Sequence, residues 1–125
     1  MSEPGDGDAA LQTDERRRRR AAAQERFDEL AVDYLARPGV TSARMFGSEG
    51  LKSHDKFFAF LDADGGMIVK VPAESAAALV ADGAAVPVRV GRHPAREWVS
   101  VPEDGDGDLR RWREVLAEAY AYACG

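Results

Sequence analysis

The chain has 125 residues, of which 45% are hydrophobic and 31% charged, the composition of a single globular domain. Its net charge of −5 argues against a protein that attracts nucleic acid or an anionic membrane through its overall charge. No apolar run approaches the roughly 20 residues of a membrane span. The first residues have no apolar centre like that of a secretory signal, and Cys124 is the single cysteine. These features predict a cytoplasmic protein with a reduced thiol.

The amino-terminal residues 1–12 are predicted to be a disordered tail, and residues 13–125 a single folded domain. Residues 1–12 lack hydrophobic periodicity and aromatic side chains. Thr13 can cap a helix over Asp14–Ala36. The apolar side chains of this helix recur at the spacing of one helical face, namely Phe27, Leu30, Ala31, Tyr34 and Leu35. The Pro38-Gly39 pair ends it.

Short runs of apolar and β-branched residues, broken by Gly, Pro and Asp, predict five strands: Val40–Phe46, Lys56–Leu61, Met67–Val71, Val86–Val90 and Glu97–Val101. The turn-forming residues Asp62 to Gly66 predict a hairpin between the second and third strands. Gly47 and Gly50 predict a tight turn or a bulge. Pro87 has no N–H donor, so either its strand lies at an edge of the sheet or the proline stands at the start of the strand.

Two further helices complete the predicted pattern. Pro72 opens a helix that Gly83 ends, and Leu109 begins a last helix that follows the acidic linker Glu103–Asp108 and reaches Gly125. The element order is α-β(3)-α-β(2)-α. We therefore expect an α+β fold, with an antiparallel sheet whose helices pack mainly on one face.

Several short motifs follow one another along the chain in a recognisable order: Arg44-Met45-Phe46-Gly47, Gly50-Leu51, Phe58-Ala59, Ile68 to Val71, Gly83, and Trp98 to Pro102. Their order and spacing resemble the N-terminal domain of the TfoX/Sxy competence regulators. Trp98 stands where that family usually has tyrosine, and the chain ends where the full-length regulators carry a second domain.

The resemblance implies a secretion-chaperone-like fold and a regulatory or interaction module rather than an enzyme. The motif residues to which it gives a structural role are Met45, Phe46, Gly47, Gly50, Val101 and Pro102.

The arginine run, which consists of Arg16, Arg17, Arg18, Arg19 and Arg20, has two interpretations. Clustered guanidinium groups can contact nucleic-acid phosphates. Five consecutive residues, however, surround a helix and cannot all face one groove, and no aromatic side chain is interleaved to stack on bases. We therefore favour a solvated helix start in which these arginines pair with nearby carboxylates.

Other polar residues carry no recognisable catalytic or metal-binding pattern. The carboxylates of Asp104, Asp106 and Asp108 fail the calcium-loop spacing, so a linker and helix cap are favoured. His54 and His93 lie in predicted loops without a nucleophile at motif spacing, and with Cys124 they make a poor zinc set. The sequence predicts no catalytic residue, metal or cofactor.

Aromatic side chains give the main indication of a partner. Seven aromatic rings are too many for one layer of helices to cover, and we expect them to point to both faces of the sheet: Phe46, Phe57, Phe58, Phe60, Trp98, Trp112 and Tyr120. Adjacent strand residues point to opposite faces, so either Phe57 or Phe58 faces away from the helices, and Trp98 raises the same problem. Leaving a large apolar side chain in water forgoes about 1.5–3 kcal/mol of burial.

We therefore expect a cytoplasmic, non-enzymatic interaction module that binds a protein partner, itself or another, through Phe57 or Phe58 and Trp98. A regulator that contacts nucleic acid through Arg16 to Arg20 is the alternative. A small ligand binder or enzyme that uses His54 or His93 is a further alternative.

Overall fold

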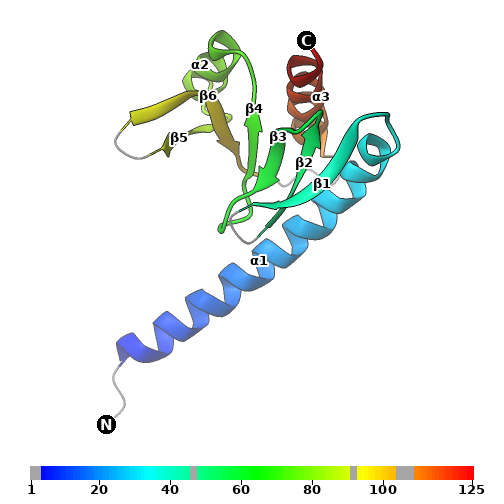
Figure 1. The fold of residues 1–125 in the computed structure, drawn as a ribbon. Coiled ribbons are helices and arrows are strands. Elements are labelled where there is room, and N and C mark those ends of the chain that lie inside the picture. The colour runs from blue at the N-terminus through cyan, green and yellow to red at the C-terminus, as the bar shows by residue number, and fades with distance from the viewer. Residues whose placement is uncertain (1–3, 46–47, 91–92, 104–108) are drawn as a thin grey trace.

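A computed structural model describes residues 4–45, 48–90, 93–103 and 109–125 of the chain. Three helices and six strands follow one another along it (Figure 1). In chain order they are α1 (Pro4–Leu35), β1 (Val40–Met45), β2 (Ser48–Ser53), β3 (Lys56–Leu61), β4 (Met67–Lys70), α2 (Ala73–Ala81), β5 (Val86–Val90), β6 (His93–Val101) and α3 (Arg110–Cys124). The predicted α+β class is confirmed.

The strands form one antiparallel sheet in the order β1-β2-β3-β4-β6-β5. The predicted hairpin between β3 and β4 is present, with Leu61 opposite Met67. β5 lies at an edge of the sheet, where the missing N–H of Pro87 costs no central ladder bond.

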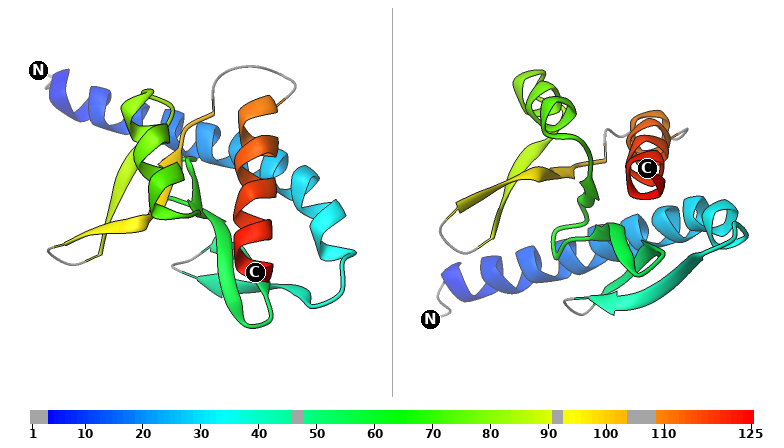
Figure 2. Two further views of the ribbon diagram at one scale, coloured as in Figure 1. Left: turned by 90° about the horizontal axis from the view of Figure 1, so that it is seen from above. Right: turned by 45° about the horizontal axis from the view of Figure 1, so that its top comes forward.

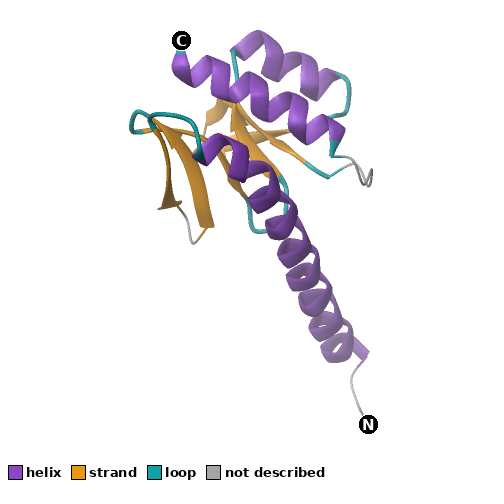
Figure 3. Ribbon diagram, turned by 90° about the vertical axis from the view of Figure 1, so that its right-hand side faces the viewer, coloured by secondary structure: helices purple, strands orange, loops and turns teal. Residues whose placement is uncertain are grey.

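One face of the sheet is covered by helices (Figures 2 and 3). α3 buries one face, which consists of Trp112, Val115, Leu116 and Ala119 at the spacing of one helical stripe. Trp112 is 1% exposed, and its indole Nε1 donates a hydrogen bond to the carbonyl oxygen of Val101 at 3.0 Å. α2 lies beside α3, where the Ser75 hydroxyl donates to Glu118. A single hydrophobic core joins all three helices to the sheet.

α1 is longer than the sequence predicted and begins at Pro4, so residues 4–12 are helical rather than a disordered tail. Ala and Leu at positions 9–11 favour helix, and a proline is tolerated in the first turn. Thr13 therefore lies inside the helix and is not its cap. The amino-terminal half of α1 projects away from the sheet (Figure 3), whereas Ala23 and Phe27, further along, are buried in the core.

β2 is a strand that the sequence did not predict. Its residues, Ser-Glu-Gly-Leu-Lys-Ser, include no β-branched side chain, and Gly50 lies among them although a glycine there favours a turn or a bulge. Pairing with β1 and β3 makes it a strand. Glycine suits position 50 of this strand, because a Cβ there would come 3.0 Å from the carbonyl oxygen of Ala59 and 3.0 Å from the Phe57 ring.

Candidate interaction surface

A β-bulge in β3 decides which way its aromatic side chains point. Leu51 pairs with Ala59 and Lys52 with Phe57, so Phe58 is an extra residue in β3. A Cβ at Gly50 would come 3.0 Å from the Phe57 ring and 3.0 Å from the Phe60 Cβ, which shows that these two side chains share a face. In a regular strand, residues three apart would lie on opposite faces, so the bulge is what brings these two together.

Phe58 belongs to the core on the helix side. It is fully buried, and its ring centroid lies 6.2 Å from that of Tyr34 in α1 and 5.7 Å from that of Tyr120 in α3. The two rings Phe58 and Tyr120 meet edge to face, a favourable aromatic geometry. Of the two candidates, Phe58 therefore does not contribute to an interaction surface, and Phe57 remains.

The opposite side of the sheet carries a second apolar cluster. We define the aromatic face as the five apolar residues that the strand register places on this side: Phe57, Phe60, Ile68, Val86 and Trp98. Ile68 is opposite Phe60, and the rings of Phe60 and Trp98 lie 5.7 Å apart. Phe60 and Ile68 are buried among their neighbours, whereas Phe57 and Trp98 are half-buried and Val86 is 54% exposed.

The prediction that the helices could not shelter the rings needs adjustment. Six of the seven rings lie in the described part of the chain, and none of the six is fully exposed. Phe58, Phe60 and Trp112 are buried, and Tyr120 packs on the helix side. The partly exposed aromatic surface away from the helices therefore consists of Phe57 and Trp98.

Two lysines lie over these rings. Nζ of Lys52 is 5.3 Å from the Phe57 ring centroid, and Nζ of Lys70 is 6.0 Å from that of Trp98. These distances permit cation–π attraction. Lys70 stands inside a strand that the sequence predicted, whereas Lys52 stands in β2, which the sequence did not predict. Their position over the rings depends on cross-strand pairing of Lys52 with Phe57 and of Lys70 with Trp98.

Strand carboxylates are directed away from the aromatic face. Within the strands, the acidic residues are Glu49 and Glu97. Glu49 stands opposite Arg44 and next to Gly50, so it lies on the helix side. Glu97 accepts a hydrogen bond from the hydroxyl of Tyr122 in α3, and this bond raises the pKa of Tyr122. The side chains that the strands place on the aromatic face are therefore apolar or cationic, and one carboxylate from a turn, that of Asp55, pairs with Lys52 at 3.7 Å.

The motif residues occupy structural positions where the structure describes them. Val101 is fully buried and accepts the Trp112 hydrogen bond, Gly50 packs against β3, and Pro102 is exposed directly after β6. Met45 ends β1. Phe46 and Gly47 lie outside the described residues.

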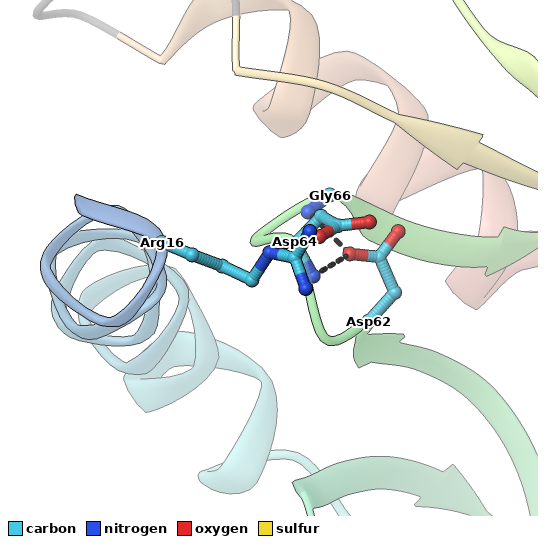
Figure 4. Close-up of polar contacts among 4 residues, drawn as sticks. All are labelled: Arg16, Asp62, Asp64 and Gly66. Atoms are coloured by element: carbon cyan, nitrogen blue, oxygen red, sulfur yellow. Dashed lines mark hydrogen bonds and ion pairs between the residues drawn. The ribbon is translucent and has the colours of Figure 1, made fainter. Parts of the chain in front are cut away.

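The arginine run is distributed around α1. Nε of Arg16 forms an ion pair with Asp64 at 3.2 Å, in the turn between β3 and β4 (Figure 4). Arg17, Arg18 and Arg19 are exposed, and Arg20 is half-buried. The partner of Arg16 is a carboxylate of the sheet and not one of the nearby helix carboxylates that the sequence suggested. A contact with nucleic acid stays a prediction.

The remaining candidate residues are separate from the aromatic face. His54 is exposed in the turn after β2, where its ring packs against Gly39. His93 begins β6, and Sγ of Cys124 lies 3.6 Å from the Ser53 hydroxyl. In the described part of the chain, no three His, Cys, Asp or Glu side chains are placed to hold a metal ion. Asp104, Asp106 and Asp108 lie outside the described residues.

Comparisons with known proteins give a family but no activity. A family model described as YjbR matches residues 35–122. This match overturns the assignment to the TfoX/Sxy regulators, which rested on short motifs. No curated protein matches the chain. Among the described residues, no helix is long and apolar enough to cross a membrane.

Proposed function

We propose that this chain, which belongs to the YjbR family, is a non-enzymatic interaction module that binds a protein partner through its aromatic face. The observation that carries the proposal is the pair of half-buried rings, Phe57 and Trp98, on the side of the sheet away from the helices. Aromatic side chains that are partly exposed and flanked by charge are typical anchors of protein interfaces. We place the protein in the cytoplasm, where the lone thiol of Cys124 stays reduced.

The chemistry of the face favours an acidic, apolar partner segment. Lys52 and Lys70 supply positive charge next to the rings, and no strand carboxylate shares this side. Lys52 also pairs with the exposed Asp55 of the β2–β3 turn, whereas no ion pair of Lys70 is found in the described part of the chain. Two copies stacked face to face would bring lysines of the same charge together, which is unfavourable. Self-association through this face is therefore the less favoured alternative to a different protein.

The experiment is a selection of binding peptides from a random displayed library, followed by titration of the selected sequences. We expect peptides that combine aromatic residues with Asp or Glu. The double variant Lys52→Gln/Lys70→Gln should weaken their binding about tenfold or more, because it removes both cations and leaves the rings in place. Trp98→Ser should abolish binding.

Lys56→Gln is the matched control, since Lys56 is an exposed lysine at the start of β3 that lies over neither ring. Selected peptides without acidic residues, or equal loss of binding in the control and the double variant, would contradict the proposal. Sedimentation at micromolar concentration separates the alternative: a dimer that Trp98→Ser dissociates would make the partner a second copy of the chain.

A further inference from the structure

We infer that the groove between α2 and the β5–β6 hairpin is a binding site for a small apolar molecule with one carboxylate, such as a linear acyl chain. The groove has a volume of about 440 Å³. This volume is within the range of small-ligand sites, about 300–1,000 Å³. The groove lies beside α2 and shares Trp98 with the aromatic face, but its other lining residues are different, and the inference does not depend on the proposed function.

The walls of the groove are almost entirely apolar. On one side α2 presents small side chains, among them Ala73, Ala77 and Val80. On the other side β5 and β6 contribute Pro87, Ala95 and Val99. Alanines on the helix leave a space that a slender chain of methylene groups can fill. Each methylene that leaves water for such a wall favours binding.

One lining residue is charged. Arg96 of β6 lies at the groove, and no ion pair of this guanidinium is found among the described residues. The backbone N–H of Val71 donates to the carbonyl oxygen of Glu97 at 2.9 Å, so the backbone of Arg96 lies close to the chain that enters α2. Val80, toward the other end of α2, and Pro87 line the groove without a charge.

This distribution of charge selects the ligand. A carboxylate at Arg96 would gain a charge-assisted hydrogen bond, while its apolar tail follows α2 toward Pro87. A peptide fits less well, because the lining side chains other than Arg96 and the Trp98 indole offer its amide groups no hydrogen bonds. Unpaired amides are costly to bury. The chemistry of the groove thus indicates an acyl carboxylate rather than a polypeptide.

The test is a titration of the full chain with octanoate and with octan-1-ol, which has the same tail and no charge. Trp98 lines the groove, whereas Trp112 is buried, so tryptophan fluorescence reports on binding. We expect saturable binding of both, with octanoate about tenfold tighter, the gain typical of a hydrogen bond to a charged group. Arg96→Gln should remove this preference and leave the binding of octanol unchanged.

Two matched pairs of variants locate the ligand. Ala77 and Ala78 are exposed neighbours on α2, but Ala77 lines the groove and Ala78 does not. Ala77→Leu should weaken both ligands, and Ala78→Leu neither. Arg89→Gln, which removes an exposed charge from β5 outside the groove, should change neither.

The inference fails if octanoate shows no saturable binding. It also fails if the preference for octanoate persists in Arg96→Gln, or if the members of either pair behave alike. Binding of the selected peptides to the aromatic face would survive Ala77→Leu in any of these cases, so the two proposals can fail separately.

Discussion

Asp62 shows how a single side chain holds a turn. Its Oδ1 accepts hydrogen bonds from the backbone N–H groups of Asp64 at 2.8 Å and Gly66 at 2.9 Å (Figure 4). Its Oδ2 accepts another hydrogen bond, at 2.6 Å, from the hydroxyl of Ser100 in β6. Gly66 is required beside it, because a Cβ there would come 2.7 Å from Oδ2. The residue thus connects the β3–β4 turn to a third strand.

We expect Asp62→Ala to lower the free energy of unfolding by about 2 kcal/mol, because three donors lose a charged acceptor. Asp64→Ala is the control. Asp64 is 75% exposed and its ion pair with Arg16 is in solvent, so its loss should cost less than about 0.5 kcal/mol. Urea unfolding of both variants measures the difference. Equal losses would mean that the backbone alone holds the turn.

At the scale of elements, α1 divides into a projecting half and a packed half. In the part whose side chains are described, burial begins at Ala23 and continues through Phe27, Leu30 and Tyr34. Arg16 is tied to the sheet by an exposed ion pair alone. The family model matches from residue 35, so the arginine run lies outside the matched range. The packed half therefore holds the helix on the sheet.

Deletion of residues 1–12 should leave the free energy of unfolding unchanged within about 0.5 kcal/mol, because exposed helix contributes little without packing. The helical signal in far-ultraviolet circular dichroism should fall. Phe27→Ala in the packed half should cost about 3–5 kcal/mol. Chemical unfolding of the three proteins measures these values. A large loss of stability on deletion would show that the projecting half packs on the body.

At the scale of the whole molecule, one core couples the three helices and the sheet, and Tyr34 lies where α1, β3 and α3 meet. Burial raises the pKa of Tyr34, and the Arg37 guanidinium over its ring, 4.4 Å from the centroid, partly opposes this. The unfolded chain then loses the phenol proton at lower pH than the folded one. This contribution to stability is complete below about pH 10 and is lost as the pH rises through the folded pKa.

We therefore expect the free energy of unfolding to decline above about pH 10, and to decline less steeply in Tyr34→Phe. Tyr122→Phe is the comparison, since the pKa of Tyr122 is also raised but its side chain is in solvent, so its contribution should be smaller. Urea titrations across the alkaline range test this. An identical slope in wild type and Tyr34→Phe would show that the core does not resist ionisation at this position.

The sequence was sufficient for the class of fold. Apolar runs with period two predicted the β3–β4 hairpin, the stripe of Trp112, Leu116 and Ala119 predicted α3, and the missing N–H of Pro87 was consistent with an edge strand. Local chemistry decides such features within a few residues. The sequence did not predict β2, because a polar strand with a central glycine gains its stability from pairing with neighbouring strands. It also indicated the wrong family, because the motifs that it offered were short.

Only the tertiary structure determined which side chains form the aromatic face and the groove beside α2. The sequence left Phe57 and Phe58 as alternatives, and the bulge in β3, a property of its pairing with β2, turned Phe58 inward and brought Phe57 to the side of Phe60. The lysines over the rings and the groove at Arg96 depend likewise on which strands and helices lie side by side. Periodicity determines that a side chain alternates between faces. Only strand register and packing determine what it meets there.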